Sequence, residues 1–468
     1  MRSPRRLVLP VVATALVVGG CSEHDFDFPA TPERSTTSGP AGTEAGSPGG
    51  PTQSVDLAPA WSLPLRHLVS APVAVGGRIV AYAANSGRLR LVVVDPRTGD
   101  VVARLPSTSS YVTPGVTMEV AARGDLVYHY RPAGQPQLAR LEVYDVRRDR
   151  VVGRGAPAYF WSLPTGCTRP DAGPVCVTAG DTNPASVYEV DPETAGLRLA
   201  VADAGRGLGA GLYDASDRIS LVQAGDRVWR RTARALFGDR PVTPTGGWDW
   251  QRRAGFLIGS FGAEERRGDG TRTKRPGHIA RIDPRSGRTL WVRPGTTYCE
   301  LDLMEPAADG PPRWFRCATS GRTGPDGEDL ATWRTTITRF DPRTGEPLWS
   351  TRPVRWDTLY DGSTWVKLSD SLVAGSRDGS LVTLDVESGQ ITKADPDAVG
   401  WCRQQRVYRD RDSAARPRTR VARGLAAPCR ADGRPVRRPA FVDPVFGASV
   451  GDTFVWASTT GLHAVDVS

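Results

Sequence analysis

Hydrophobic residues recur along this chain in short runs, and most of these runs end at a similar five-residue turn. The runs at residues 89–94, 279–282, 337–340 and 381–384 have the length and periodicity of β-strands. Asp-Pro-Arg-Thr-Gly follows at 95–99 and again at 341–345, with close copies at 283–287 and 385–389. A copy with one extra residue stands at 191–196, and a weaker copy stands at 145–149. We name these segments repeat turns, and each predicts a β-hairpin because a second apolar run follows it.

Turn chemistry explains the residues of the repeat turn. The leading Asp can accept backbone N–H groups, Pro fixes φ for a type I turn, and the closing Gly takes a left-handed conformation. Another pair of candidate strands precedes several repeat turns. These pairs lie at residues 72–75 and 78–82, 364–367 and 371–374, and 448–450 and 453–457. Four short antiparallel strands in a unit of about 45 residues are typical of one blade of a β-propeller.

The spacing of the repeat turns gives the number of units. One turn is missing between Asp191 and Asp283, where residues 211–222 predict an eroded unit, and the last unit ends at Asp466. We therefore predict an all-β, eight-bladed β-propeller at residues 57–468, with seven blades as the alternative. The chain ends in a third strand, and residues 57–64, which include Trp61, resemble a fourth strand. We predict that the N- and C-terminal strands pair and close the ring, which removes an open sheet edge.

Two complete copies of a longer pattern carry a resemblance to a known family. Asp283, Gly287 and Trp291 have the same spacing as Asp341, Gly345 and Trp349. This pattern resembles the repeat of pyrroloquinoline-quinone-like (PQQ-like) β-propellers, and the resemblance covers roughly residues 57–468. That family includes quinoprotein dehydrogenases, BamB-like lipoproteins and sensor modules, so the resemblance implies a fold and leaves the function open. The two Trp residues are predicted to pack between adjacent blades.

The first 56 residues predict export and a membrane anchor. Residues 1–21 read as a signal peptide, with Arg2, Arg5 and Arg6 before an apolar run at 7–18. Residues 18–21 resemble a bacterial lipobox, which implies that Cys21 receives lipid, including palmitate; an ordinary secretory signal is the alternative. Residues 22–56 are rich in Pro, Gly, Ser and Thr and predict a disordered tether. We expect an extracytoplasmic protein, held at the cell membrane by its lipid.

The six remaining cysteines predict disulfide bonds, as is usual in exported proteins. The predicted pairs are local in sequence: Cys167 with Cys176, Cys299 with Cys317, and Cys402 with Cys429. The first two pairs are expected to join the first and second strands of a blade. The sequence contains no C-x-x-C and its five His residues are scattered, so we predict no metal site.

Positive charge is concentrated in one insertion. The formal net charge is +9, and residues 401–440 hold twelve Arg and three Asp. Two interpretations stay open. The basic insertion contacts anionic lipid head groups or an acidic cell-wall polymer, or it is a solvated, Pro-interrupted loop fixed by Cys402 and Cys429. No aromatic stacking pattern accompanies the Arg residues, so nucleic acid is not a predicted partner.

The sequence contains no recognised catalytic motif. His67, His129, His278 and His463 stand singly in or near strands and are interpreted as structural. We predict a monomeric, non-catalytic binding or scaffold protein without a cofactor, whose partner is an envelope protein, peptide or glycan. The alternative is a quinoprotein dehydrogenase, although the chain lacks the adjacent Cys pair that many of those enzymes carry. Residues 264–275, 306–333 and 402–439 are the insertions predicted to shape a binding face.

Overall fold

The computed structural model describes most of the chain after residue 57. It covers residues 58–467 apart from 66, 111–117, 136, 168–174, 181–185, 202–205, 208–211, 216–217, 224–225, 239–247, 267–271, 300–311, 324–331, 360–364, 411–417, 437, 439 and 443–445. The predicted signal peptide, Cys21 and the tether lie outside the described residues. No helix of the described segments is long and apolar enough to span a membrane.

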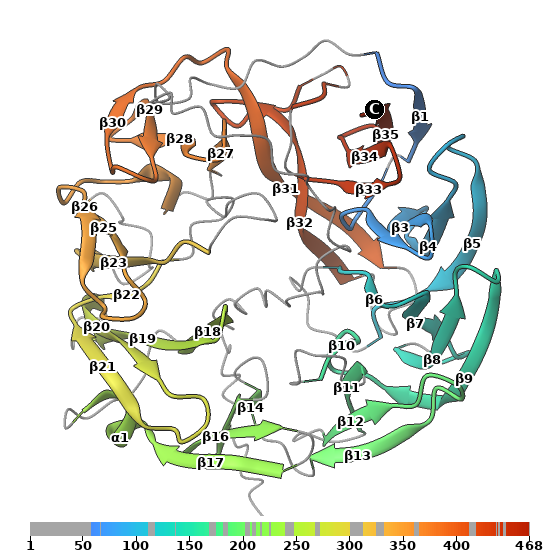
Figure 1. Ribbon diagram of the computed structural model, residues 1–468, viewed down its shortest axis with the longest axis horizontal. Helices are drawn as coiled ribbons and strands as arrows, with labels where there is room; N and C mark the ends of the chain where they lie inside the picture. The colour runs from blue at the N-terminus through green and yellow to red at the C-terminus, as the bar shows by residue number, and fades with distance from the viewer. Residues whose placement is uncertain are drawn as a thin grey trace, which may run out of the picture.

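The described chain is an all-β structure, as predicted. Its strands form eight antiparallel sheets that are arranged in a ring around a common centre (Figure 1). The first three sheets consist of β2 (Val73–Val75), β3 (Arg78–Asn85), β4 (Arg88–Val94) and β5 (Val101–Ser107); β6 (Ala121–Arg123), β7 (Leu126–Pro132), β8 (Leu138–Asp145) and β9 (Arg150–Tyr159); and β10 (Thr165–Gly166), β11 (Val175–Ala179), β12 (Ser186–Val190) and β13 (Leu197–Val201).

The next three sheets follow in the same order. They consist of β14 (Arg206–Gly207), β15 (Leu212–Ala215), β16 (Arg218–Gln223) and β17 (Asp226–Thr232); β18 (Trp248–Arg253), β19 (Phe256–Arg266), β20 (Arg272–Ile282) and β21 (Thr289–Pro294); and β22 (Thr297–Tyr298), β23 (Phe315–Ser320), β25 (Arg334–Phe340) and β26 (Pro347–Ser350). The short helix α1 (Ala233–Phe237) follows β17, and β24 (Arg322–Thr323) pairs with β20. Sheet β14–β17 shows that the predicted eroded unit has four strands.

The last two sheets depart from this pattern. The seventh has six strands: β27 (Val366–Lys367), β28 (Leu372–Arg377), β29 (Ser380–Asp385), β30 (Ile391–Lys393), β31 (Val399–Asp410) and β32 (Arg418–Arg430), with the 3-10 helix η1 (Asp357–Leu359) before it. The eighth combines β33 (Ala448–Val450), β34 (Thr453–Ala457) and β35 (Gly461–Asp466) with β1 (Trp61–Pro64) from the other end of the chain. Trp61 lies opposite Ala464 in the β1–β35 ladder, so the first described strand is the outer strand of the last sheet.

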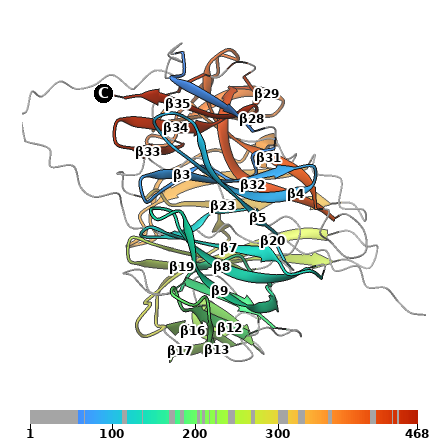
Figure 2. The ribbon, with the colours of Figure 1, turned by 90° about the vertical axis from the view of Figure 1, so that its right-hand side faces the viewer.

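The repeat turns have the predicted hydrogen bonds. In each of four turns, the Asp carboxylate accepts the backbone N–H two residues later, at 2.7–3.0 Å. The closing glycines Gly99, Gly287, Gly345 and Gly389 have φ between +66° and +76°, where a side chain is strained. Because the turns join third strands to fourth strands, they lie on one side of the ring. The C-terminus, at the end of a third strand, marks that side in Figure 2.

Trp residues on four outer strands dock onto the repeat turn of the following sheet. The indole N–H donates to the carbonyl of the second turn residue at 2.7–3.1 Å, and the ring covers the closing glycine. The pairs are Trp61 with Pro96 and Gly99, Trp229 with Pro284 and Gly287, Trp291 with Pro342 and Gly345, and Trp349 with Val386 and Gly389. A Cβ on any of these glycines would lie 2.6–2.9 Å from the ring, so only glycine fits. The predicted packing of Trp291 and Trp349 between sheets is confirmed.

The contact between the second and third sheets reverses this arrangement, because the outer strand carries the glycine and the turn carries the side chain that fills the space. Gly153 of β9 stands where other outer strands carry Trp, and the repeat turn that it faces holds the extra residue Ala195. Ala195 is fully buried at φ +56°, and a Cβ on Gly153 would lie 2.7 Å from the Ala195 nitrogen. The inserted turn residue therefore occupies the space that an indole fills elsewhere.

Two predicted insertions are regular structure instead. Residues 306–333 contain β23, which is the second strand of its sheet and includes the buried Phe315. Residues 264–275 extend the β19–β20 hairpin to the Arg266–Arg272 pair, where β24 adds to β20. The described residues of both segments belong to antiparallel ladders with neighbouring strands, and their role in a binding face stays a prediction.

Candidate functional site: an arginine-rich hairpin on the inner edge of one sheet

The basic insertion forms a long hairpin, β31–β32, which we name the basic hairpin. Strand β31 pairs with β27, the first strand of its sheet, at Val366–Cys402 and Lys367–Trp401. Strand β32 pairs with β31 along almost its whole length. Figure 1 shows both strands on the inner side of the ring, between β27 and β33. The interpretation of residues 401–440 as a solvated loop is wrong for the residues of these two strands, because β27 offers an unpaired edge that the insertion extends.

The base of the basic hairpin is packed between sheets. Trp401 is buried, and its indole N–H donates to the Val442 carbonyl at 2.9 Å. Leu425 of β32 is fully buried in a cluster with Ile79 of the first sheet and Val455 of the last. The hairpin thus contacts three sheets at its base, which fixes the direction in which its free end projects.

A buried lysine lies where the hairpin joins the ring. The Lys367 side chain is 1% exposed, and its Nζ lies 3.1 Å from the Asp370 carboxylate and 5.8 Å from the centre of the Phe446 ring. Burial of a charge is favourable only when such partners compensate for lost hydration. Because β31 covers this strand, Lys367 belongs to the attachment of the hairpin and not to an open surface.

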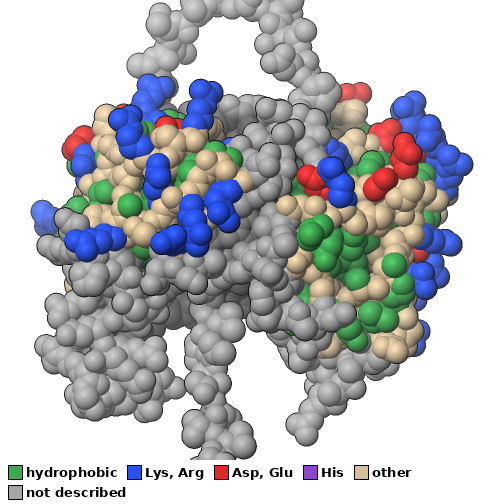
Figure 3. Space-filling model, turned by 90° about the horizontal axis from the view of Figure 1, so that it is seen from below, with side chains coloured by type: hydrophobic (Ala, Val, Ile, Leu, Met, Phe, Trp, Pro, Cys, Tyr) green, Lys and Arg blue, Asp and Glu red, His purple; other side chains and the backbone are tan. Residues whose placement is uncertain are grey.

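Arginines outside the basic hairpin lie exposed on the outer edge of the ring or contact the repeat turns of neighbouring sheets. Arg227, Arg230 and Arg231 of β17 are exposed on the outer edge of the ring. Figure 3, seen from below, shows Lys and Arg side chains on both the left and the right, and hydrophobic side chains gathered on the right. Two arginines at contacts between neighbouring sheets donate to the repeat turn of the next sheet. Arg231 donates to the Ser286 carbonyl at 2.9 Å, and Arg281 donates to the Arg343 carbonyl at 3.0 Å. Their role is to join neighbouring sheets.

The six cysteines lie in the three predicted pairs at disulfide distance. Their Cα atoms are 4.9 Å apart for Cys167 and Cys176, 5.1 Å for Cys299 and Cys317, and 5.9 Å for Cys402 and Cys429. The first two pairs join the first and second strands of a sheet, as predicted. The third pair joins β31 to β32 at the base of the basic hairpin.

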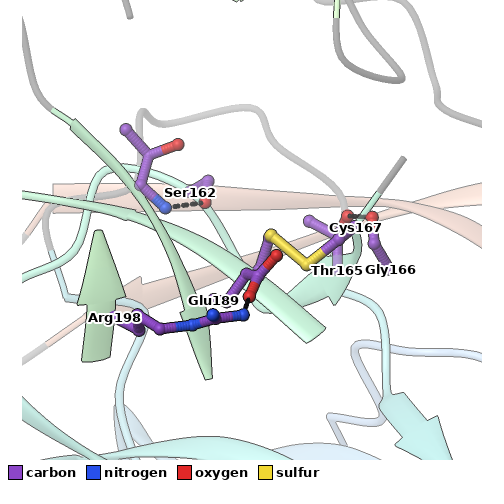
Figure 4. The surroundings of a disulfide bond; sticks show 8 residues. Ser162, Thr165, Gly166, Cys167, Glu189 and Arg198 are labelled. Atoms are coloured by element: carbon purple, nitrogen blue, oxygen red, sulfur yellow. Dashed lines mark hydrogen bonds and ion pairs between the residues drawn. A yellow bond between two sulfur atoms is a disulfide. The ribbon is translucent and has the colours of Figure 1, made fainter. Parts of the chain in front are cut away.

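Figure 4 shows the first of these pairs in its surroundings. Cys167 follows β10 and Cys176 lies on β11, while Arg198 of β13 pairs with Glu189 of β12 beside them. The Arg198 side chain is largely exposed, so its ion pair contributes little to stability. The surroundings of Cys167 and Cys176 therefore indicate a structural role for this pair.

Two of the single histidines are structural. His129 is fully buried; its Nδ1 lies 3.2 Å from the Ser107 hydroxyl and its Nε2 lies 3.7 Å from the Glu142 carboxylate. Arg131 and Arg154 also contact this carboxylate. Burial, reinforced by the charge of Arg131, lowers the pKa of His129 to about 4, so its imidazole is neutral at pH 7.

His463 has a comparable environment at the pairing of β35 with β1. Its ring nitrogens lie 2.8 Å from the Ser62 hydroxyl and 2.7 Å from the Ser458 hydroxyl. Burial lowers its pKa to about 4 as well. Although a Ser-His-Glu arrangement occurs at His129, Ser107 and His129 are enclosed between sheets, where no substrate has access.

The Ca²⁺ and quinone that the fold family implies need a particular set of ligands. Calcium requires six to eight oxygen ligands, usually with several carboxylates. Within the described segments, no three His, Cys, Asp or Glu side chains are grouped so that they hold one metal ion.

Comparisons with known proteins found only distant similarity. No family profile matches the chain, and no curated protein matches it. BamB from Moraxella catarrhalis is similar at 13% identity and a TM-score of 0.32, over 87% of this chain and 98% of that one. The quinohemoprotein alcohol dehydrogenase ADHIIG from Pseudomonas putida HK5 is similar at 13% identity and a TM-score of 0.40, over 76% of this chain and 72% of that one.

A europium-containing methanol dehydrogenase is similar at 12% identity and a TM-score of 0.36, over 75% of this chain and 85% of that one. These structure neighbours are PQQ-like β-propeller proteins, the kind that the repeat turns resemble. They include both BamB and dehydrogenases, so the likeness assigns no activity.

Proposed function

We propose that the chain is a lipid-anchored, extracytoplasmic binding or scaffold protein whose eight sheets are the blades of one closed propeller. Its partner is an envelope protein, peptide or glycan. Cys21 carries the lipid, residues 22–56 form the tether, and the three cysteine pairs are disulfides. The observation that carries this proposal is the basic hairpin, because it is an addition to the repeat that is held firmly at its base and extends inside the ring.

The pairing of β1 with β35 and the docking of Trp61 on Gly99 support a closed ring. The first contact joins β1 to the last strand of the chain, β35, and the second joins β1 to the repeat turn of the first sheet. A closed ring of short sheets presents loops and insertions around one centre, which suits recognition of a macromolecule.

Site-specific photocrosslinking in intact cells tests the proposed function. A photoreactive residue in place of Tyr408 on β31 is expected to capture one envelope component, and the same residue in place of Leu348 is not. Leu348 is a matched control because it is 59% exposed on the outer strand β26, far from the hairpin in the fold. Equal capture at both positions, or at neither, would contradict the proposal.

The dehydrogenase alternative has its own measurement. Purified protein is mixed with pyrroloquinoline quinone and Ca²⁺, and binding is followed by absorbance while alcohol and sugar oxidation is assayed. Stoichiometric binding with turnover would replace the scaffold proposal by an enzymatic one. We expect neither, because no three described His, Cys, Asp or Glu side chains are grouped so that they could hold one metal ion.

A further inference from the structure

The outer strand of the seventh sheet is shorter than the strand that it covers, and a groove lies beside its end. Strand β30 pairs with β29 only at residues 382–384, whereas β5 of the first sheet pairs with β4 along almost its whole length. The Ala394 N–H still donates to the Leu381 carbonyl at 3.2 Å, and the chain then turns away at residues 395–398. The groove that remains has a volume of about 530 Å³.

One face of this sheet brings apolar and basic residues together at the groove. Arg377 of β28 lies opposite Ser380 of β29, and Val382 of β29 lies opposite Lys393 of β30. Residues that lie opposite each other, or two positions apart in one strand, share a face of the sheet. On this face Val382 and Ile391 are half-buried and form an apolar floor. Arg377 and Lys393 stand on the two strands that flank β29, so the apolar floor has two positive charges beside it.

Both cations are accessible to a ligand. Lys393 is exposed and pairs with no carboxylate of the described chain. The Arg377 side chain is 33% exposed, and its Nε lies 3.9 Å from the Asp378 carboxylate, which is a weak contact at this distance. The Asp395 carboxylate accepts the Asp397 N–H at 3.0 Å, and neither Asp378 nor Asp395 lines the groove. An acidic group attached to an apolar one therefore complements this lining.

The main chain of β30 has an open outer edge, because no described strand lies beside it there. The Gln390 carbonyl and the Ala394 N–H both bond to β29. Since N–H and C=O groups of successive strand residues point to opposite edges, those of Thr392 face β29, and those of Ile391 and Lys393 face outward. Outward N–H and C=O groups of this kind form hydrogen bonds with an added strand.

We propose that this groove binds an acidic peptide segment of a partner protein, which adds to β30 as an extended strand. In the resulting ladder, the peptide residue opposite Lys393 is acidic and forms a charge-assisted hydrogen bond with it. The peptide residue opposite Ile391, two positions away, is apolar and covers the floor of the groove. The residue between them faces the other side of the sheet. The predicted motif is thus an acidic and an apolar residue with one position between them.

The open main chain favours a peptide over other anions. An anionic polymer without amide groups would pair with Arg377 and Lys393, but it would leave the outward groups of β30 without hydrogen bonds. The groove is also separate from the basic hairpin, because β30 and β32 are the opposite edges of the seventh sheet. The inference therefore goes beyond the proposed function and adds a second contact that does not depend on the hairpin.

Binding of labelled peptides to the purified chain tests the proposal. The peptide Thr-Asp-Thr-Val-Thr-Asp-Thr, which we name the in-phase peptide, places its acids and its valine on one face of a strand. The out-of-phase peptide, Thr-Thr-Asp-Val-Asp-Thr-Thr, has the same composition but places them on opposite faces. Fluorescence anisotropy is expected to show at least about tenfold tighter binding of the in-phase peptide. The variant R377Q/K393Q is expected to remove this difference, whereas the matched variant R88Q/R218Q, which removes two exposed cations from other sheets, preserves it.

Amide hydrogen exchange tests the added strand itself. With the in-phase peptide bound, exchange at Ile391 and Lys393 should slow at least about tenfold, and Thr392, whose N–H already faces β29, is the internal control. Equal affinity for the two peptides, equal loss in both double variants, or unchanged exchange at Ile391 and Lys393 would each overturn the inference. Inorganic polyphosphate is the remaining probe, and tighter binding of polyphosphate than of the in-phase peptide, lost in R377Q/K393Q, would replace the peptide by an anionic polymer. Envelope capture at Tyr408 is measured separately and is unaffected by these results.

Discussion

The contact between Trp61 and Gly99 joins the first strand of the chain to the repeat turn of the first sheet, so it tests ring closure. The indole of Trp61 donates to the Pro96 carbonyl at 2.7 Å and covers Gly99, whose φ is +76°. A Cβ on Gly99 would lie 2.7 Å from Trp61 Cδ2 and 2.8 Å from Cε3. The substitution Gly99→Ala therefore adds steric overlap to backbone strain.

The two contributions can be separated with a control. A left-handed alanine costs about 1–2 kcal/mol, and forcing an extra methyl against a packed ring costs about 1–3 kcal/mol more. Gly255 has φ +77° and no atom within 4 Å of the position that a Cβ would take, so Gly255→Ala carries the strain alone. We expect Gly99→Ala to lower the free energy of unfolding by about 2–5 kcal/mol and Gly255→Ala by about 1–2 kcal/mol.

A double-mutant cycle with Trp61→Ala isolates the overlap. In the Trp61→Ala background, Gly99→Ala is expected to cost no more than Gly255→Ala, which corresponds to a coupling of about 1–3 kcal/mol. The measurement is urea unfolding of the oxidised chain at pH 7, with unfolding rates as a second readout in case refolding is incomplete. A Gly99→Ala cost equal to that of Gly255→Ala, or one that persists without Trp61, would refute the closure contact.

Three further predictions concern other parts of the ring. Gly153→Ala is expected to destabilise by about 1–3 kcal/mol because its Cβ meets the buried turn at Ala195, whereas Gly134→Ala, with open space around it, costs only backbone strain; thermal unfolding compares them. Replacing Cys402 and Cys429 with Ser is expected to cost about 2–4 kcal/mol and to speed proteolysis of the basic hairpin, which limited trypsin digestion measures. Since His129 has a folded pKa of about 4, below its usual value of 6.5, the unfolded chain binds the proton first, so stability falls as pH drops from about 6.5 to about 4. His129→Gln should flatten the pH dependence of the urea midpoint over this range, and an unchanged slope would contradict that assignment.

The sequence predicts the strands and turns well because local chemistry determines them. The repeat turns require Asp to accept backbone N–H groups and Gly at positive φ, and both features hold at Asp95, Asp283, Asp341 and Asp385. Residues 448–450 and 453–457 coincide with β33 and β34 because alternation around a short polar turn permits little else. The spacing of single residues was therefore sufficient to find most sheets.

Residues whose role depends on a neighbouring sheet were harder to find. Trp229 docks like Trp291, but no repeat turn precedes it, so the spacing argument did not include it. The contact between Gly153 and Ala195 also has no local sequence signal. The extra turn residue Ala195 can be explained only by its packing against Gly153 of the neighbouring sheet. A search for Trp near the start of each fourth strand would have identified Trp229.

The loop interpretation of the basic hairpin, one of the two left open, failed for a related reason. Its strands are rich in Arg and have Pro417 between them, which together resemble a solvated loop. Its pairing partner is β27, more than 30 residues earlier, and its base is completed by Ile79 and Val455 of other sheets. The charge of this segment could indicate an unusual surface. Its regular β-structure could not be predicted, because the basic hairpin is held by contacts with residues distant in sequence.

Departures from the repeat indicate where function resides in this fold. Where Trp residues dock between sheets, the turn, the glycine and the indole together join the sheets, and the buried His129 also joins two sheets through Ser107. The seventh sheet adds two strands that closure does not require, and these strands hold seven Arg and one Asp. An acidic envelope component is therefore the kind of partner that we propose for this addition.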